Sequence, residues 1–530
     1  MIYLAHSKKE NIPEQEYSAH IRGASSLAYE YVRDMVSYSE CDKELLSQAV
    51  KKATVYHDLG KLNKENQNVL SGKVSLKSLP RNHVDAGAAH FLNVKHFSAV
   101  SAVAIQAHHI GFPDFSAEMN KGEVAFRDVA IATEVDKELP ELEAIHDNLI
   151  ETIFEYGTEE IKGDRSVFFR MLLSCIADAD HTDTAINYRK YPTNAKTIPL
   201  RPTERLKQLD CHISELQLKG ADDERNALRN EMYLACRDAE INSGISSCDS
   251  PVGSGKTTAV MAHLLAQAKK RGLRRIFVIL PFTNIIKQSV ETYRDMLVLP
   301  GEDADEVVAE LHHRADFESE DSRHLTALWR APIIVTTAVA FFETLASNST
   351  ATLRRLHELP GSAIFVDESH AALPARLLPL AWKSINVYAA EWNCYWVMAS
   401  GSLSRFWTIA EIAGKNNLNC VPEIISDELR ERLSVYENKR IFYQSDLCPK
   451  GTAELADWIN AFPGPRLVIL NTVQSAAVVA DYFSEHFGRN HVEHLSTALT
   501  SNDRDITLGR VKERLSNKED TDWTFVATSC

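Results

Sequence analysis

Residues 250–258 read Ser-Pro-Val-Gly-Ser-Gly-Lys-Thr-Thr, directly before an amphipathic stretch that extends to residue 271. Glycine at 253 and 255 lets backbone N–H groups surround phosphate oxygens, and a helix starting at Lys256 directs its positive dipole end toward them. The pattern predicts a phosphate-binding loop for ATP, in which Lys256 contacts the β- and γ-phosphates and Thr257 holds Mg²⁺. The loop residues are Ser250, Gly253, Ser254, Gly255, Lys256, Thr257 and Thr258.

A second part of this nucleotide site follows downstream, at Ile364-Phe-Val-Asp367-Glu368-Ser369-His370. A hydrophobic strand that ends in Asp-Glu places the Asp on Mg²⁺ through water and the Glu on the attacking water as general base. We therefore expect Asp367 to bind Mg²⁺, Glu368 to be catalytic, and His370 to link the nucleotide to the rest of the domain.

Short apolar runs separated by amphipathic stretches surround these two motifs. The runs are 276–280, 333–337, 363–367, 395–399, 467–470 and 524–528. Continuous apolar strands between helices predict a parallel α/β sheet that is buried on both faces. One stretch does not fit this pattern, because residues 245–249, directly before the loop, are unusually polar for a central strand.

Residues 1–185 have a helical pattern instead, for example over 18–38 and 165–180. This region contains candidate metal ligands: His20, the adjacent His57 and Asp58, His83, the pair His108 and His109, and Asp178 and Asp180. Mixed imidazole and carboxylate ligands suit divalent transition metals, and two such metals can hold both oxygens of a phosphodiester displacement. Other histidines fit no pattern, and we expect them to be ordinary residues: His6, His90, His96, His312, His313 and His324.

The composition sets wider limits. A chain of 530 residues predicts about three domains. The net charge of −15 argues mildly against non-specific nucleic-acid binding, although a translocating enzyme needs only a locally basic groove. Because no apolar run is long enough to span a bilayer and no signal peptide precedes the chain, we expect a cytoplasmic protein without membrane contact. The nine cysteines include no Cys-x-x-Cys pair, so neither zinc sites nor disulfides are expected.

The order of the nucleotide motifs resembles superfamily 2 helicases of the DExH type. Residues 280–284 and 335–338 resemble the strand-end segments with which that family grips a single strand. This resemblance implies DNA-binding roles for Pro281, Thr283, Asn284, Thr336 and Thr337. Ser400, Gly401 and Ser402 stand where the family has Ser-Ala-Thr, which couples hydrolysis to movement. Residues 471–472, 503–504 and 526–529 resemble segments of the second motor domain.

The N-terminal histidines resemble the HD phosphohydrolase superfamily and, more narrowly, the nuclease domain of the type I CRISPR effector. That domain's order, His…His-Asp-x-Gly-Lys…His…His-His…Asp, is present in full. The resemblance implies two divalent transition metals (Mn, Co, Ni or Fe): one on His20, His57, Asp58 and Asp180, and one on His83, His108 and His109 with Asp58 bridging. It implies Asp58 and Lys61 as catalytic residues, with Lys61 neutralising the scissile phosphate. Asp180 fits the last ligand better than Asp178, but spacing alone does not separate them.

The combined resemblance covers nearly the whole chain and implies a multidomain fold. We expect an all-α HD-type nuclease domain at 1–190, a linker at 191–205, a RecA-like α/β helicase domain at 206–430, and a second, incomplete RecA-like domain at 431–530. The implied function is antiviral defence. A guide-RNA surveillance complex opens an R-loop, the motor moves 3′ to 5′ on single-stranded DNA, and the HD site cuts as an endo/exonuclease. The family's sixth motif, which supplies arginine fingers worth roughly 10³–10⁵ in rate in related chemistry, does not follow, so we expect a C-terminally truncated motor that binds ATP and hydrolyses it poorly.

Two other functions compete with this interpretation. The first is an HD-type nucleotide phosphohydrolase in which the motor is a regulatory ATPase. The second is a DNA-binding or recruitment fragment that does not hydrolyse ATP. The histidine pair at 108 and 109 and the fused motor argue against the first. The full set of candidate metal ligands argues against the second for the N-terminal half, whereas the missing motor motifs are compatible with it for the other half.

Overall fold

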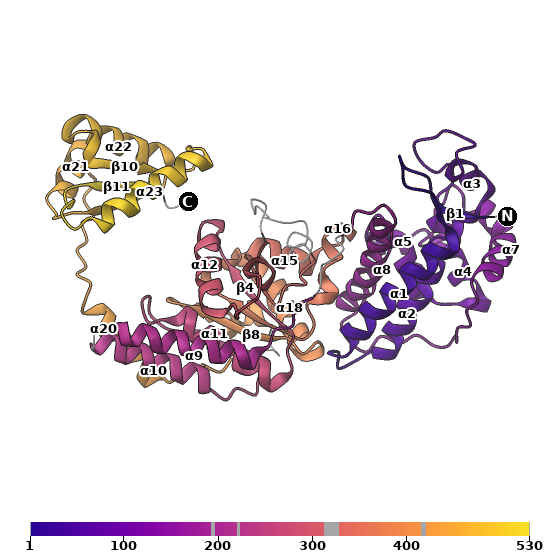
Figure 1. Ribbon diagram of the computed structural model, residues 1–530, viewed down its shortest axis with the longest axis horizontal. Coiled ribbons are helices and arrows are strands. Elements are labelled where there is room, and N and C mark those ends of the chain that lie inside the picture. The colour runs from indigo at the N-terminus through magenta and orange to yellow at the C-terminus, as the bar shows by residue number, and fades with distance from the viewer. Residues whose placement is uncertain (1, 192–196, 220–222, 312–327, 415–419, 529–530) are drawn as a thin grey trace. The chain divides into compact units, whose positions relative to one another are not determined.

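The computed structural model describes residues 2–191, 197–219, 223–311, 328–414 and 420–528 (Figure 1). The chain divides into two compact units, Met1–Ile441 and Phe442–Cys530. The expected boundary at 431 falls inside α20 (Asp427–Asn438), which packs in the first unit because its Leu429 and Leu433 are buried in that unit's core. The expected nuclease and first motor domains therefore share one compact unit.

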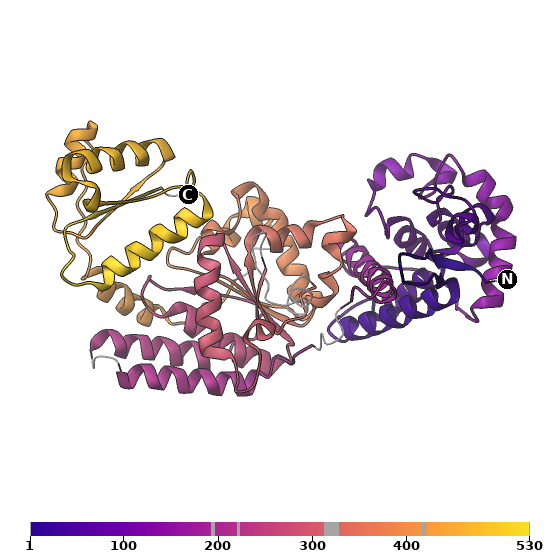
Figure 2. The ribbon, with the colours of Figure 1, turned by 45° about the horizontal axis from the view of Figure 1, so that its top comes forward.

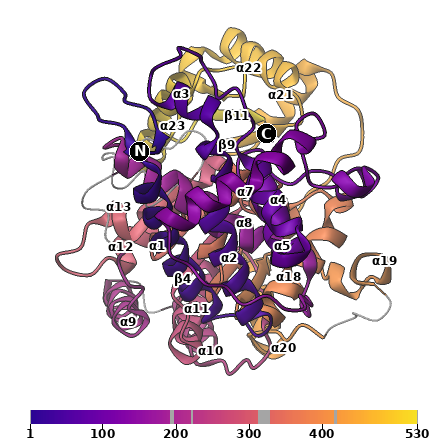
Figure 3. The same cartoon turned by 90° about the vertical axis from the view of Figure 1, so that its right-hand side faces the viewer.

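The first part of this unit is helical, which confirms the predicted helical region (Figure 3). The helices predicted over 18–38 and 165–180 are α1 (Tyr17–Val36) and α8 (Arg165–Asn187), which pack against each other and against α2 (Lys43–Tyr56). The other elements are β1 (Leu4–His6), β2 (Gln15–Glu16), η1 (Leu59–Leu62), α3 (Lys64–Leu70), α4 (Val84–Leu92), η2 (Val94–His96), α5 (Ala99–Ala107), α6 (Phe115–Met119), η3 (Gly122–Val124) and α7 (Ala132–Leu149).

A six-stranded sheet follows, with all its strand pairs parallel, as predicted (Figure 2). Its order is β3-β8-β7-β4-β6-β5. The strands are β3 (Ile245–Asp249), β4 (Arg275–Leu280), β5 (Val308–Leu311), β6 (Ile333–Thr337), β7 (Ser362–Val366) and β8 (Tyr395–Ser400). Around them lie α9 (Pro202–Lys219), α10 (Glu224–Asp238), α11 (Lys256–Arg271), η4 (Thr283–Ile285), α12 (Ile286–Leu297), α13 (Ala304–Val307), α15 (Ala338–Ala346), α16 (Thr350–Leu353), η5 (Leu356–Glu358), α17 (Ser369–Ala372), η6 (Ala375–Leu377), α18 (Leu378–Glu391), η7 (Phe406–Thr408) and α19 (Ala410–Ala413).

The position of β3 explains the polar stretch before the phosphate-binding loop. This strand is at the edge of the sheet and pairs with β8 alone among the named strands, so it is not a central strand. Its serines are buried but bonded: Ser246 Oγ shares a hydrogen bond of 2.8 Å with the Tyr395 hydroxyl, and Ser247 N donates to Pro422 O over 2.9 Å. An edge strand can carry polar side chains where such partners are present.

The two faces of the sheet belong to two different cores. Alternate strand residues such as Val278 and Val335 pack in a core with α10, α11 and α12. Their neighbours, such as Phe277 and Ile334, pack in a core with α15 and α18. This second core continues without a break into the N-terminal helices, because it also contains Met171 and Leu173 of α8. The N-terminal helices therefore join this core by packing on its other helical elements, with α8 contacting α16 and η5.

A buried charge cluster joins the same two parts. Asp178 of α8 has no exposed side-chain surface, and it accepts hydrogen bonds from Arg330 Nη2 at 2.7 Å and from Arg354 Nη2 at 2.8 Å. Arg330 also pairs with Glu358 at 3.1 Å. A carboxylate can remain buried when two guanidinium groups satisfy it. Asp178 is therefore a structural residue of the contact between the two parts.

The second unit contains a three-stranded parallel sheet of order β10-β11-β9. Its elements are α21 (Thr452–Asn460), β9 (Arg466–Leu470), α22 (Val473–Phe487), η8 (Arg489–His491), β10 (Val492–Leu495), α23 (Ser501–Ser516) and β11 (Thr524–Thr528). A small core forms where α21 and α22 cover one face of this sheet. Among the described helices of the whole chain, none combines the length and the apolar character needed to cross a membrane.

We predict that Asp178→Ala lowers the free energy of unfolding by about 3–5 kcal/mol, because it removes the buried carboxylate that pairs with the buried Arg330 and the partly buried Arg354. Urea denaturation of the full chain measures this. The control is Asp34→Ala, which removes a partner of Arg33 whose side chain is 74% exposed, and it should cost no more than about 1 kcal/mol. Equal effects of the two substitutions would show that the buried cluster has no special role.

Candidate metal centre and nucleotide site

The candidate metal ligands lie mostly at the ends of helices. His57 follows the last residue of α2, His83 precedes the first residue of α4, and His108 follows the last residue of α5. His20 and Asp180 instead project from within α1 and α8. Because α1, α2, α4, α5 and α8 pack together, ligands from segments far apart in the sequence converge in one place.

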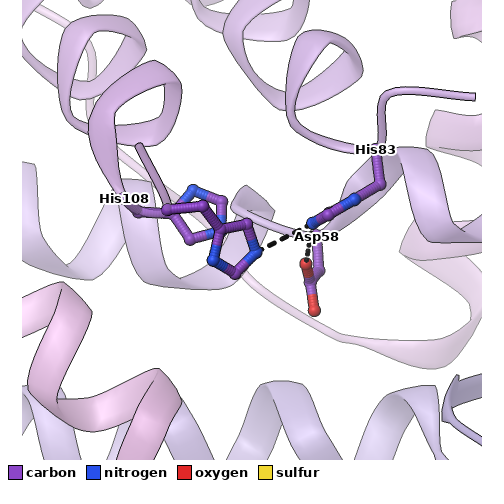
Figure 4. Close-up of side chains that lie close together, drawn as sticks. Asp58, His83 and His108 are labelled. Atoms are coloured by element: carbon purple, nitrogen blue, oxygen red, sulfur yellow. Dashed lines mark hydrogen bonds and ion pairs between the residues drawn. The ribbon is translucent and has the colours of Figure 1, made fainter. Parts of the chain in front are cut away.

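The structure places these residues in two groups. Within each group, the possible ligand atoms all lie within 4.8 Å of one another. The His83 group contains Asp58, His83, His108 and His109, and the His20 group contains His20, His57 and Asp180. Figure 4 shows Asp58, His83 and His108 pointing toward one another from three separate segments. Of the eight candidate ligands named from the sequence, all but Asp178 are thus brought together.

Asp58 lies between the two groups. Its Oδ2 atom is 3.1 Å from His20 Nε2 and 3.4 Å from His57 Nε2, whereas its Oδ1 atom is 3.5 Å from His83 Nε2. Each oxygen therefore faces one group, which is the arrangement that a bridging carboxylate needs. Lys61 Nζ is 2.6 Å from Asp58 Oδ2, so its charge is directed at this carboxylate.

In three of the histidines, a hydrogen bond of Nδ1 determines that Nε2 is the ring nitrogen that faces the ligand groups. His57 Nδ1 donates to Thr54 O over 2.7 Å, and His108 Nδ1 donates to Ile105 O over 2.6 Å. His20 Nδ1 lies 2.7 Å from a carboxylate oxygen of Asp183. A ring that donates from Nδ1 keeps the lone pair of Nε2 for a metal, and such outer partners orient ligating histidines in metal sites.

The charges of the site also suit metal binding. Burial lowers the pKa of His108 well below its usual range and that of His83 to about 4, so these rings are neutral, which is the ligating form. Burial would raise the pKa of Asp58, but the charges of Lys61 and His57 and the contact with His20 hold it well below its usual range. His20 is the exception: burial opposes a charge on its ring, yet hydrogen bonds with Asp180, Asp183 and Asp58 raise its pKa to about 10, so this ring has to release a proton before its Nε2 can bind a metal.

Two further residues border the centre that the sequence interpretation did not assign. Asp183 orients His20 and lies three residues after Asp180 on α8, a spacing that returns to the same helix face and was the available signal. His6, which we expected to be an ordinary residue, lies in β1 with its ring centroid 4.8 Å from that of His20. Burial and the neighbouring Lys61 lower the pKa of His6 to about 3. Nothing in its short strand pattern separates it from other histidines.

The sequence alone did not separate Asp178 from Asp180 as the last candidate ligand, but the contacts of the two carboxylates do. Asp180 Oδ1 is 3.4 Å from His20 Nε2 and 3.8 Å from His57 Nε2, whereas Asp178 is bonded to the arginines described above. Two residues of helix rotate a side chain by about 200°, so the two carboxylates face opposite sides of α8. Asp180 is therefore the one available as a ligand.

A third group of metal-type side chains contains His90, His96 and Glu143. The two rings are stacked, with centroids 4.6 Å apart and planes 11° apart, and His90 Nδ1 is bonded to Glu143 at 2.7 Å. The lone pair of an imidazole nitrogen lies in the plane of its ring, so two parallel rings do not direct both lone pairs at one ion. We interpret this group as a stack, and the expectation that His90 and His96 are ordinary residues stays a prediction. His312, His313 and His324 lie outside the described residues.

The two main groups suit divalent transition metals because they contain buried nitrogen and oxygen atoms to which the described residues make no hydrogen bond. His108 Nε2 is buried and has no hydrogen-bond partner among the described residues. Neither oxygen of Asp58 accepts a hydrogen bond of good geometry, although Lys61 and His20 are close. Buried polar atoms without partners are costly, and imidazole nitrogen with carboxylate oxygen is the ligand set of Mn, Fe, Co and Ni sites.

The phosphate-binding loop has the geometry that its sequence predicts. α11 begins at Lys256 and ends at Arg271, as expected, and Gly253 and Gly255 have φ values of +93° and +82°. Ser254 Oγ donates to Ser250 Oγ over 3.2 Å, so Ser250 supports the loop from the position where a stricter motif has glycine. Thr257 lies in the first turn of α11, whereas Thr258 Oγ1 contacts Met296 Sδ at 3.9 Å and so faces α12.

A chain of polar contacts connects this loop to the segments downstream. Lys256 Nζ lies 2.9 Å from Glu368 Oε1 and 3.2 Å from Asp367 Oδ1. Ser400 Oγ donates to Glu368 Oε2 over 2.9 Å, and His370 Nδ1 lies 2.7 Å from the same hydroxyl. Ser402 N donates to Ser400 Oγ, and the backbone at Gly401 lies against Val252 of the loop. The residues expected to bind ATP and those expected to couple hydrolysis thus form one connected site.

The proposed strand-end contacts for DNA are adjacent at one edge of the sheet. Leu280, which precedes Pro281 and Thr283, pairs with Thr337 in the register of β4 and β6. The hydroxyl of Thr336 donates to Leu311 O over 2.9 Å, and that of Thr337 accepts from Ala340 N over 3.1 Å as the N-cap of α15. These two hydroxyls therefore have structural roles. Asn284 lies within η4.

Comparison with known proteins identifies the fold. Residues 233–379 match the DEAD/DEAH box helicase family. The chain is similar to the crystal structure of T. fusca Cas3 with ADP, at 17% identity and a TM-score of 0.62, over 99% of this chain and 69% of that chain. The T. fusca Cas3–ATP structure gives 16% and 0.60, and T. fusca Cas3 alone gives 17% and 0.59, with the same coverage. No curated protein sequence matches.

The chain therefore contains a DEAD/DEAH box helicase domain within a Cas3-like fold. This confirms the predicted helicase domain and the predicted order of a helical region before a parallel α/β core. At this level of identity the likeness establishes the fold, and the metal centre has to be argued from its own residues.

We predict that Asp183→Ala weakens binding of metal to the His20 group by about 10–100-fold, because His20 loses the carboxylate that orients its ring. Asp183→Asn keeps an acceptor for His20 Nδ1 and should lose less. Isothermal titration of the full chain with Mn²⁺ measures both. Asp481→Asn, on an exposed position of α22, is the control. Unchanged affinity in Asp183→Ala would remove Asp183 from the centre.

Proposed function

We propose that this chain is a metal-dependent nuclease for single-stranded DNA joined to an ATP-driven 3′ to 5′ helicase motor, as in the type I CRISPR effectors that its motifs resemble. The observation that carries the proposal is that two ligand groups connected by Asp58 lie in the same compact unit as the phosphate-binding loop of a DEAD/DEAH box helicase domain. In this proposal a guide-RNA surveillance complex in the cytoplasm supplies the opened strand, so the enzyme needs no base-reading device.

The His20 group and the His83 group would each hold one divalent transition metal, with Asp58 contacting both. Such ions, when bound, lower the pKa of a coordinated water and stabilise charge on the oxygens of a phosphodiester. The chain's own residues position this chemistry: Asp58 orients both groups, Asp183 orients His20, and Lys61 places a positive charge beside Asp58, where the scissile phosphate would bind.

The motor half would bind ATP with Mg²⁺ through the phosphate-binding loop, Lys256, Thr257 and Asp367. Glu368 would orient the attacking water, since it lies at the end of β7 beside Lys256. The contact from Glu368 through Ser400 to His370 would pass the state of the nucleotide to the segment 400–402. The adjacent ends of β4 and β6 would contact the DNA strand that the motor delivers.

We predict that the two sites fail separately. His57→Ala should abolish metal-dependent cleavage and leave ATP binding unchanged, because it removes a ligand of the His20 group. Lys256→Ala should abolish ATP binding and leave ATP-independent cleavage. The assay is cutting of circular single-stranded DNA with Mn²⁺, Co²⁺ or Ni²⁺, with EDTA as control and with or without ATP, beside binding of a fluorescent ATP analogue.

Three outcomes would contradict the proposal. Loss of both properties in either variant would show that the sites are not separable. Release of phosphate from deoxynucleotides or cyclic nucleotides without DNA cutting would identify a mononucleotide phosphohydrolase. DNA binding without cutting by any metal would leave the recruitment function.

A further inference from the structure

The backbone that follows the pair His108 and His109 is held by the sheet-containing part of the first unit. Thr350 Oγ1 donates to His109 O over 3.2 Å, and Phe112 N donates to Asn348 O over 3.0 Å. Asn348 Nδ2 returns a third bond to Phe112 O at 3.4 Å. These bonds join segments more than 200 residues apart in the sequence, so residues 347–350 form a clamp on residues 109–112.

Gly111 shows how close this contact is. Its φ of +84° is unfavourable for residues with a side chain, and a Cβ there would overlap the carbonyl oxygen of Asn348 and lie 3.3 Å from Ser349 Cα. Gly122, in the same helical region, has a similar φ of +66°, but nothing lies within 4 Å of a Cβ built on it. The two glycines have the same kind of backbone, and only Gly111 is pressed against the clamp.

His109 is the ligand that most needs such support. Its side chain is 36% exposed, whereas those of His57 and Asp58 have no exposed surface. His57 and His108 each donate a hydrogen bond to a carbonyl of their own helix. Among the described residues, the polar partners of the His109 ring are instead two other candidate ligands, His83 Nε2 at 2.9 Å and Asp180 Oδ2 at 3.9 Å. Its ring is therefore positioned mainly through its backbone, which the clamp holds at His109 O.

Two contacts anchor the N-terminal end of the clamp. Arg170 of α8 donates from Nε to Ser347 O over 2.8 Å. At this same end, α15 runs from its N-cap, Thr337 at the end of β6, to Ala346, directly before the clamp. One short helix thus connects the strand end that we assign to DNA contact with the segment that holds His109.

We propose that residues 347–350 are a positioning element for the His83 group, so that full metal affinity of this group depends on the motor part of the chain. The inference rests on the proposed metal centre. It adds that a segment of the motor fold, which binds no metal itself, sets the geometry of His109 through Thr350 and Asn348. A displacement of β6 and α15 would then change the affinity of the His83 group.

The test is isothermal titration of the full chain with Mn²⁺, repeated with Co²⁺. The wild-type chain should show two sites. Gly111→Ala should weaken one of them by at least about tenfold, as disturbance of ligand-supporting contacts does, and Gly122→Ala, which carries the backbone strain without the clash, should retain both. Thr350→Val removes only the bond to His109 O and should weaken the same site to a smaller degree. Binding of a fluorescent ATP analogue should be unchanged in all three variants.

The possible results distinguish failure of the clamp from failure of the proposed metal centre. A wild-type chain that binds no metal would contradict the proposed metal centre. Two unaltered sites in both Gly111→Ala and Thr350→Val would overturn the clamp while leaving the centre intact. If Gly111→Ala lacks a cooperative thermal transition, Thr350→Val decides: a weakened site supports the clamp, and an unchanged one overturns it. Equal losses in Gly111→Ala and Gly122→Ala would assign the effect to backbone strain and overturn it as well.

Discussion

The buried carboxylate of Asp58 is the constraint on which the helical part of the structure depends. A carboxylate without exposed surface is costly unless nearby charges compensate it, and Lys61 and His20 supply that compensation at 2.6 and 3.1 Å. Neither oxygen is satisfied by a well-formed hydrogen bond, so the packing of the surrounding helices is needed to keep this arrangement together. Those helices converge with polar side chains pointing inward, which hydrophobic burial alone would not select.

Helix α8 contributes acidic side chains to three separate interactions. Asp180 faces the ligand groups, Asp183 on the same side orients His20, and Asp178 on the opposite side binds the arginines of the motor part. The helix is buried nearly all round, and its apolar residues belong to the core that also contains Phe277 and Trp329. The candidate ligand groups and the core on one face of the sheet therefore both include residues of α8, so the position of Asp180 depends on the packing of the motor fold.

Much of this could be predicted from the sequence, because local patterns report on local structure. The period of apolar residues indicated β6 and the glycines with the following helix indicated α11, and both have the predicted bounds. The edge position of β3 and the shared core were not predictable in this way, because the same polar or amphipathic pattern is compatible with several partners. His6 likewise became part of the centre only through the pairing of β1 with β2, which its own three-residue strand does not reveal.

The shared core also limits how the two halves of the first unit can communicate. Independent domains joined by a small, polar interface can rotate against each other, but here separation would expose a continuous apolar cluster and the buried carboxylate of Asp178. A large hinge motion between the N-terminal helices and the motor part would therefore be costly. Communication by small shifts of packed elements needs no such exposure, and close-packed interiors transmit displacements of this kind. A small shift of this kind can begin at the nucleotide site, because Lys256 contacts Glu368 and the Ser400 hydroxyl contacts both Glu368 and His370. A motor built on this sheet would consequently influence the candidate ligand groups through the strand ends and the short helices that follow them.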